Sequence, residues 1–389
     1  MRSSAARDGT CAKTRTPHPP GHAARKTDDM PTPPASTPSP LGQPKRFARE
    51  GLHRLLAKVF AHPDGRQVLF DAVRGFRPAT ERLPPLPAPP YTDLPHARAA
   101  PAAPPVFITA RFRSGSTLLW QLFRALPTAT AFYEPHNERR WFDPSSRGGK
   151  VDQSHLGVDD YWREYDGMTE LARFYRDEWA ERHFYMGEDF PEPAMRDYIA
   201  YMIEHAPQRP VLQFNHVDFR LPWLRRQFPT ARLLHLYRHP RDQWISSLMR
   251  ASEVPRDVTT ADFWRYDRFY LLRWAEDLCF QFPFLDPRHE PRPYRLFYLM
   301  WRLSHHYGRA FAHASVAFED LVAQPRVEMA RLLEAAQWPA TDLDPLVALV
   351  KPVRGGAWAD FAPAAWFADH EAACEEILTR ELGPLPPLT

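Results

Sequence analysis

The chain has 389 residues, of which 44% are hydrophobic and 25% are charged, and its formal net charge is +3. These values are ordinary for a globular protein with a sizeable core, and no apolar run approaches the roughly 20 residues that cross a bilayer, so no membrane span is expected. The three cysteines, Cys11, Cys279 and Cys374, are far apart. They exclude a disulfide framework or a cysteine-based metal cluster and favour a reducing, cytoplasmic location.

The first hundred residues divide into three segments. Residues 1–45 are rich in Pro and Ala and carry an excess of positive charge, which predicts a disordered tail rather than a nucleic-acid-binding segment. Residues 46–77 place apolar side chains at helical spacing on both sides of an HPDG turn, which predicts a helical hairpin. Residues 78–105 hold ten prolines in 28 positions and are expected to form an extended linker.

The main domain is expected over 106–370, followed by a C-terminal helix and tail over 371–389. Short apolar runs predict strands that alternate with helical patterns, and this alternation favours an α/β fold with a parallel sheet. The aromatic-rich segment 150–208 is expected to be mostly helical. The predicted strands lie near 106–109, 132–138, 210–216, 231–237 and 316–318.

The sequence ARFRSGSTLL (110–119) joins the first strand to a helix. Gly115 allows a ligand to approach the backbone, and a helix N-terminus presents free amide groups with a partial positive charge, so the loop predicts a phosphate site. Compared with the phosphate loop of nucleotide triphosphatases, Ser116 stands in place of the lysine and Thr117 matches the Ser/Thr. Arg113 offers a planar set of donors instead, suited to phosphate or sulfate oxygens. A plain capped turn is the structural alternative.

A second anion site is predicted where the strand of LLHLYRHPRDQWISSLMR ends. Arg238 lies at the carboxyl end of this strand, where ligands of parallel sheets bind. Ser246 and Arg250 share one face of the following helix. The alternative is a surface helix in which Arg241 and Asp242 form a local ion pair.

Together, FRSGSTLL and YRHPRDQWISS resemble the two nucleotide signatures of sulfotransferases that use 3′-phosphoadenosine 5′-phosphosulfate (PAPS). The segments FEDLVAQP and KPVRGGA (351–357) fit the same family, in particular its tyrosylprotein and bacterial branch. The resemblance implies a three-layer α/β/α fold like that of P-loop nucleotide triphosphatases, with a central parallel sheet and helical insertions. It implies that the 5′-phosphosulfate is held by Arg113, Ser114, Gly115, Ser116 and Thr117, and the 3′-phosphate by Arg238 and Ser246, with Arg250 and Lys351 as further donor-binding residues.

The same resemblance makes Glu134 the candidate general base, because the tyrosylprotein branch has its catalytic glutamate at this offset from the first loop. Arg113 is the second candidate catalytic residue. His136 and Glu138 are neighbouring alternatives for the base. No metal is required by sulfuryl transfer to a hydroxyl, and the sequence shows no convincing cluster of metal ligands.

One position departs from the family. Many relatives carry a lysine on the strand where this chain has Gln213, which offers no charge. Arg113, His216 or Lys351 could supply the missing cation. Otherwise the chain is a catalytically weak sulfotransferase-like nucleotide-binding or scaffold protein; an atypical P-loop kinase is a further alternative.

The acceptor is expected to carry a hydroxyl. Residues 139–208 and 251–312 hold aromatic side chains interleaved with arginines, which could stack a sugar, a phenol or a peptide tyrosine. A carbohydrate, a lipid-linked glycan, a phenol and a peptide therefore all stay open.

Overall fold

The computed structural model describes Leu55 and residues 103–147, 158–353 and 355–387. Apart from Leu55, all of these belong to the second of two compact units, Arg77–Thr389. The predicted tail 1–45 lies outside the described residues, as do the hairpin 46–77 except Leu55 and the linker 78–105 except residues 103–105. Among the described residues, no helix has both the length and the apolar character that a membrane span needs.

A central sheet of five parallel strands organises the second unit, in the order β2-β3-β1-β4-β5. The inner strands β1 and β4 are buried along nearly their whole length, as expected for strands covered on both faces. The chain crosses from one side of β1 to the other between β3 and β4. The strands are β1 (Val106–Ala110), β2 (Ala129–Tyr133), β3 (Arg209–Phe214), β4 (Arg232–Tyr237) and β5 (Ala314–Ala317).

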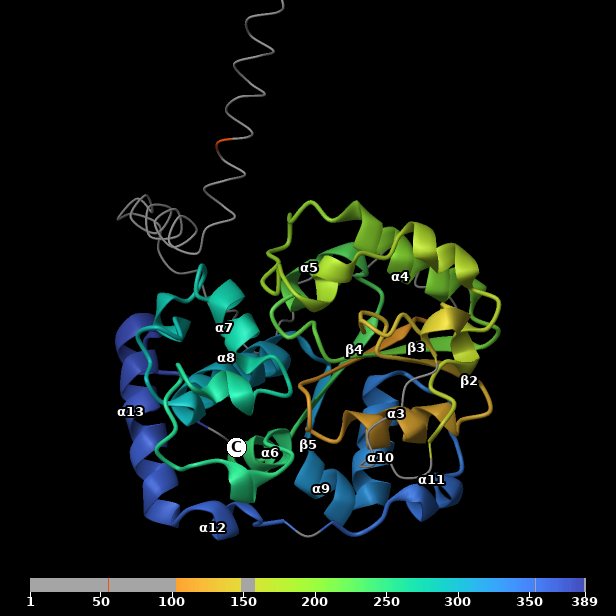
Figure 1. Ribbon diagram of the computed structural model, residues 1–389. Helices are drawn as coiled ribbons and strands as arrows, with labels where there is room; N and C mark the ends of the chain where they lie inside the picture. The colour runs from red at the N-terminus through yellow and green to blue at the C-terminus, as the bar shows by residue number, and fades with distance from the viewer. Residues whose placement is uncertain (1–54, 56–102, 148–157, 354, 388–389) are drawn as a thin grey trace, which may run out of the picture. The chain divides into compact units, whose positions relative to one another are not determined.

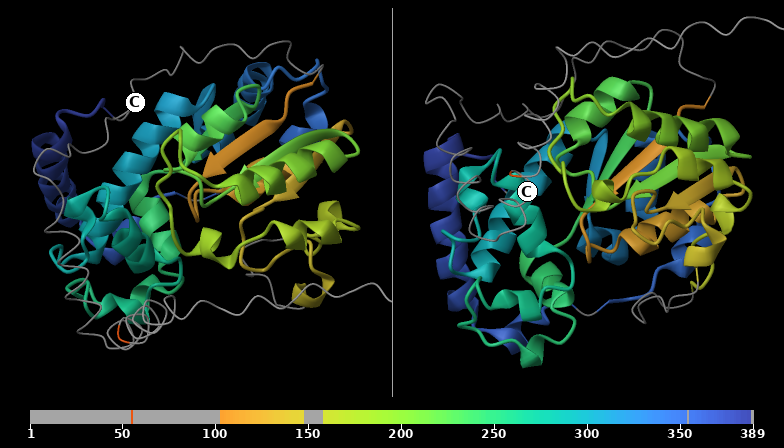
Figure 2. Two further views of the ribbon diagram at one scale, coloured as in Figure 1. Left: turned by 90° about the horizontal axis from the view of Figure 1, so that it is seen from above. Right: turned by 45° about the horizontal axis from the view of Figure 1, so that its top comes forward.

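Helices cover both faces of the sheet, which confirms the predicted three-layer α/β/α class (Figures 1 and 2). One layer holds α3 against β2 and β3, and α10 against β4 and β5. The other layer holds α8 against β4 and β5, and α5 and α13 pack on α8. The α-helices are α3 (Ser116–Arg124), α4 (Pro193–His205), α5 (Leu221–Gln227), α6 (Pro240–Ser247), α7 (Leu271–Leu278), α8 (Pro293–Phe311), α9 (Phe318–Ala323), α10 (Pro325–Ala335), α11 (Asp344–Leu349), α12 (Trp358–Phe361) and α13 (Ala364–Leu382).

Two expectations for elements need correction. The described part of 150–208 contains one α-helix, α4, and otherwise short 3-10 helices, because its aromatic side chains, such as Tyr161 and Trp179, are buried without a sustained helical period. The expected boundary between 370 and 371 falls inside α13. The 3-10 helices are η2 (Pro144–Ser146), η3 (Arg163–Tyr165), η4 (Thr169–Arg173), η5 (Asp177–Ala180), η6 (Ala251–Glu253), η7 (Phe263–Arg265) and η8 (Pro283–Leu285).

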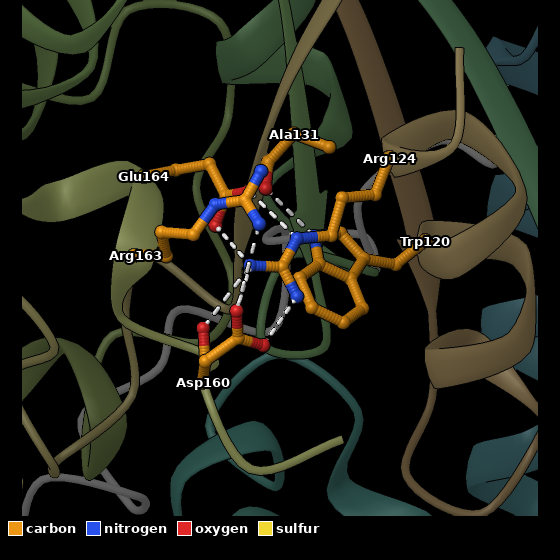
Figure 3. Close-up of polar contacts among 6 residues, drawn as sticks. All are labelled: Trp120, Arg124, Ala131, Asp160, Arg163 and Glu164. Carbon is orange, nitrogen blue, oxygen red and sulfur yellow. Dashed lines mark hydrogen bonds and ion pairs between the residues drawn. The ribbon is translucent and has the colours of Figure 1, made fainter. Parts of the chain in front are cut away.

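Arg124 at the end of α3 anchors the segment that follows residue 158 (Figure 3). Its guanidinium donates to the carboxylates of Asp160 and Glu164 at 2.7 Å each, and it lies 4.8 Å from the ring of Trp120. The indole of Trp120 in turn donates to the carbonyl of Ala131 on β2. This cluster fixes α3 and the segment after residue 158 beside β2, and Glu134 of the candidate site directly follows this strand.

Candidate functional site

The first predicted loop follows β1 directly and ends at Gly115, which has a φ of +92°. A Cβ at this glycine would lie 2.2 Å from the Phe318 ring, so both the backbone conformation and the close approach require glycine. No side chain of the described ranges caps the first turn of α3. The amide groups of that turn therefore keep the partial positive charge that favours an anion.

The side chains of this loop point in different directions. Arg113, with a φ of 65°, donates through Nε to the hydroxyl of Ser246 at 3.1 Å and lies 5.4 Å from the Phe269 ring. Ser114 is buried, and its hydroxyl donates to the carbonyl of Arg111 at 2.6 Å. Ser114 thus lies beneath the loop, whereas Arg113, Ser116 and Thr117 line a cavity.

The second predicted site lies beside the first. Arg238 follows β4 and donates through Nη1 to the carbonyl of Arg113 at 3.2 Å. Its buried Nε atom lies 4.0 Å from Oε1 of Glu319 and forms no hydrogen bond with the residues that the structure describes. Burial lowers the pKa of Arg238, while Asp242 and Glu319 act in the opposite direction. Because residue 113 contacts both 238 and 246, the two predicted anion sites form one basic surface.

Arg250 and Lys351 also line this cavity, but both are exposed, and Arg250 pairs with Glu253 at 3.3 Å. We call Arg113, Arg238, Ser246, Arg250 and Lys351 the basic end of the cavity.

The local pair between Arg241 and Asp242 does not form. Arg241 pairs with Glu371 of α13 at 2.6 Å, and Asp242 accepts from the amide of Gly356 at 3.0 Å. The surface-helix alternative is therefore wrong at these positions. The first turn of α6 instead fastens the segment after Lys351 and the final helix.

Glu134 stands immediately after β2 with a φ of 42°, in the left-handed region. Its carboxylate is buried and accepts from Nδ2 of Asn137 at 2.6 Å. Burial raises the pKa of Glu134 to about 7, and the hydrogen bonds from Asn137 and Tyr133 oppose this rise. A carboxyl group with a pKa near neutrality can take up and release protons under physiological conditions.

The other residues considered for base or cation lie elsewhere. His136 is buried among Trp179, Tyr198 and Phe214, and burial lowers its pKa well below the usual value. Burial also lowers the pKa of His216 to about 3, so this ring is neutral and cannot be the missing cation.

Gln213 is fully buried in β3, and its amide has no hydrogen-bond partner among the residues that the structure describes. Neither the two histidines nor Gln213 lines the cavity, whereas Glu138, Arg113 and Lys351 do.

The cavity has a volume of about 850 Å³ and lies at the carboxyl ends of the strands. Apart from Ser114, every predicted site residue lines it, so residues from 113 to 351 meet at one place. Four of the seven non-glycine residues with positive φ in the described ranges also line it: Arg113, Glu134, Met249 and Tyr270. Such strained backbone tends to gather at functional sites.

Sequence reasoning singled out Glu134 and Glu138 but not the rest of the cavity wall to which they belong. This wall comprises Glu134, Glu138, Arg139 and Trp141 after β2, and Tyr266, Arg268, Phe269 and Tyr270 before α7; we call it the carboxylate end. The segments 139–208 and 251–312, rich in aromatic side chains and arginines, cover the rest of this wall, but nothing local to them indicated which side chains face a cavity. Within the described ranges, no three His, Cys, Asp or Glu side chains gather as metal ligands.

Comparisons with known proteins identify a family. Residues 104–342 match the sequence profile of the sulfotransferase family. Among solved structures, the sulfotransferase domain from the curacin biosynthetic pathway is 17% identical with a TM-score of 0.37, covering 74% of this chain and 94% of its own. Sulfotransferase STF9 from Mycobacterium avium is 16% identical with a TM-score of 0.37, covering 73% and 77%. The sulfotransferase domain of the Synechococcus PCC 7002 olefin synthase is 20% identical with a TM-score of 0.33, covering 75% and 93%. A search of curated protein sequences found no match.

Proposed function

Since the chain belongs to the sulfotransferase family and is a sulfotransferase, we propose that it moves the sulfuryl group of PAPS to a hydroxyl acceptor. The observation that carries the proposal is the meeting of the two predicted anion sites. The Nε–Oγ distance of 3.1 Å between Arg113 and Ser246 joins residues 133 positions apart in the sequence. One ligand with two separated phosphate groups accounts for such a surface better than two unrelated anions.

In this proposal the basic end binds the donor. Arg113, Gly115, Ser116 and Thr117, with the uncapped first turn of α3, hold the 5′-phosphosulfate. Arg238 and Ser246 hold the 3′-phosphate, with Arg250 and Lys351 at the rim. Within the described residues the buried Nε of Arg238 forms no hydrogen bond and lies 4.0 Å from Oε1 of Glu319, so it can still donate to a phosphate oxygen. Ser114 supports the loop from below, because its hydroxyl donates to the carbonyl of Arg111 and does not line the cavity.

Glu134 acts as the general base. Its carboxylate accepts the proton of the acceptor hydroxyl while the acceptor oxygen forms a bond to sulfur and the bond from sulfur to the 5′-phosphate oxygen breaks. Arg113 and the amides of α3 stabilise the charge that develops on the departing phosphate. A base with a pKa of about 7 is half ionised at neutral pH. After each turnover it can release the proton that it accepted and so return to the carboxylate form.

In this proposal another residue supplies the positive charge that a lysine supplies in relatives, where this chain has Gln213. Arg113 and Lys351 both line the cavity, and the Arg113 guanidinium is held by Ser246 and Phe269. We therefore assign the catalytic cation to Arg113. We further propose a cytoplasmic location, because Cys279 and Cys374, the cysteines within the described ranges, are free thiols.

Calorimetric titration with 3′-phosphoadenosine 5′-phosphate, ADP and ATP–Mg²⁺ tests the donor assignment. We expect micromolar binding of the bisphosphate and at least tenfold weaker binding of the other two, because only the bisphosphate reaches both Arg113 and Arg238. Preference for ATP–Mg²⁺ would indicate a kinase-like protein. Bisphosphate binding without any PAPS turnover would indicate a nucleotide-binding scaffold.

A further inference from the structure

A tyrosine hydroxyl on β2 links the first loop to the proposed base. The Oη atom of Tyr133 lies 3.0 Å from Oγ1 of Thr117 in the first turn of α3, and either hydroxyl can be the donor. The Tyr133 hydroxyl also forms a hydrogen bond with the carboxylate of Glu134, the next residue. All three residues line the cavity. One phenol group therefore bridges a residue assigned to the 5′-phosphosulfate and the residue assigned to proton transfer.

The ring of Tyr133 is held in place by its surroundings. Only 2% of the residue is exposed, and its ring centroid lies 4.6 Å from that of Tyr161 and 4.8 Å from that of Trp120. Its backbone carbonyl accepts from the Tyr165 hydroxyl at 2.9 Å. The ring is thus fixed, while the direction in which its hydroxyl proton points can still change.

The number of hydroxyl protons sets the direction of both bonds. A phenol has one proton to donate, and an ionised carboxylate only accepts, so Tyr133 donates to Glu134 and Thr117 donates to Tyr133. The oxygens of an ionised phosphate or phosphosulfate also only accept. To bind such a group, the Thr117 hydroxyl must turn its proton away from Tyr133. The Thr117 oxygen can then accept a hydrogen bond from Tyr133 instead.

We propose that Tyr133 is a positioning residue that couples donor binding to the base: when the Thr117 hydroxyl turns to the donor, the Tyr133 hydroxyl turns from Glu134 to Thr117. This inference rests on the proposed function. The change leaves the carboxylate with the bond from Asn137 and opens a lone pair for the acceptor hydroxyl. It also removes a bond that stabilises the ionised form, so donor binding raises the pKa of Glu134 and makes it a stronger base.

Other groups around the Glu134 carboxylate also act on its charge. Burial is the largest cause of its raised pKa, Glu138 adds to the rise, and Arg139 opposes it. The charged and titratable groups that face it are Tyr133 on β2, Glu138 and Arg139 on the following turn, Tyr165 on η3, and Arg113, Arg268 and Tyr270 on the wall of the same cavity. The negative charge of a bound donor raises the Glu134 pKa as well, so the test must separate this charge from the loss of the Tyr133 bond.

Calorimetric titration of the full chain with 3′-phosphoadenosine 5′-phosphate at pH 7.5, in buffers of different ionisation enthalpy, measures the protons taken up on binding. Glu134→Gln gives the uptake that belongs to the nucleotide and to other groups. A rise of the Glu134 pKa by about one unit, the effect of one hydrogen bond to a charged group, adds about half a proton in the wild-type chain. We expect Tyr133→Phe, which keeps the ring and loses only the hydroxyl, to show less than half of this excess.

Two further substitutions test the bridge from its other end. Thr117→Val removes the hydroxyl that turns, so the excess should fall as it does in Tyr133→Phe. Thr117→Ser keeps a hydroxyl at this position and should keep the excess. An excess that survives in Thr117→Val would contradict the proposed coupling.

Tyr198→Phe is the matched control, because it also removes one buried hydroxyl beside the same turn. The Tyr198 hydroxyl donates to the carbonyl of Pro135 at 2.7 Å, and Tyr198 does not line the cavity. Its proton uptake should equal that of the wild-type chain, and a loss as large as in Tyr133→Phe would refute the coupling.

The outcomes separate this inference from the donor assignment. An equal excess in Tyr133→Phe and in the wild-type chain, or no excess of the wild-type chain over Glu134→Gln, overturns the inference and leaves the donor assignment standing. Failure of the wild-type chain to bind the bisphosphate overturns both.

Discussion

The basic end and the carboxylate end of the cavity are built in different ways. Apart from Lys351, the basic end comes from two strand–loop–helix corners of the sheet, each encoded within about a dozen consecutive residues. The carboxylate end comes from a turn after β2 and a segment before α7, joined by the bond between Glu138 and Tyr270. The first kind of site can be read from short motifs, while the second exists only after distant segments pack together. We therefore expect the two ends to respond separately to substitution.

Glu134→Gln is expected to give the largest difference between the effect on turnover and the effect on donor affinity. Loss of the general base should lower turnover about 10²–10⁴-fold while the affinity for the 3′,5′-bisphosphate stays unchanged, because the substitution removes a proton acceptor and no donor contact. Steady-state kinetics and calorimetry on the same preparation measure both. If turnover survives, Glu138 is the next base to test, since His136 is buried outside the cavity.

Arg238→Ala should affect the other end. We expect affinity for the bisphosphate to fall by about 2–4 kcal/mol, because a buried guanidinium that meets a phosphate is removed. Affinity for the 5′-monophosphate should change much less, since that ligand lacks the 3′-phosphate. Arg250→Ala is the comparison variant, and its exposed side chain predicts a loss of about 1 kcal/mol or less. Equal losses for both nucleotides in Arg238→Ala would contradict the assigned role.

The ionised Glu134 carboxylate should also lower the free energy of unfolding of the protein. Its folded pKa of about 7 lies above the ordinary value of 4.5, so the folded protein binds more protons than the unfolded chain between these values. Stability at this group is therefore lost as pH rises from about 4.5 through 7. At pH 8 we expect Glu134→Gln to be more stable than the parent by up to about 3 kcal/mol. Urea unfolding at pH 5 and pH 8 measures the free energy of unfolding of the variant and the parent. If the variant differs from the parent by the same amount at both pH values, the effect does not come from ionisation of Glu134.

The smallest effect concerns Asn137, which positions the base. Its hydrogen bond lowers the pKa of Glu134, so Asn137→Ala should raise that pKa and shift the rising limb of kcat/KM to higher pH. At pH 7 we expect a loss of a few-fold, because a hydrogen bond of this kind contributes about 1–2 kcal/mol. Activity should recover at pH 9. A loss of the same size at every pH would instead indicate that the turn itself has collapsed.

Much of the fold followed from local pattern. The buried runs near 106, 210 and 232 are strands of a parallel sheet, and the α/β class is confirmed, because strands covered on both faces are nearly continuous apolar runs. The prediction of mostly helix over 150–208 was wrong for its described part. There, buried aromatic side chains signal packing, which does not by itself specify a helical period.

The sequence by itself determined the two corners of the sheet. The first corner is a strand followed by Gly115 and the start of a helix, and the second is a strand followed by Arg238. Backbone sterics and hydrogen bonds within a few residues determine both. Only the tertiary structure decided that Arg113 reaches Ser246, that Glu138 meets Tyr270, that burial raises the pKa of Glu134, and that His136 and His216 are withdrawn from the cavity. These properties depend on desolvation and on contacts between residues more than a hundred positions apart. Both arise only when the core excludes water, so no short motif encodes them.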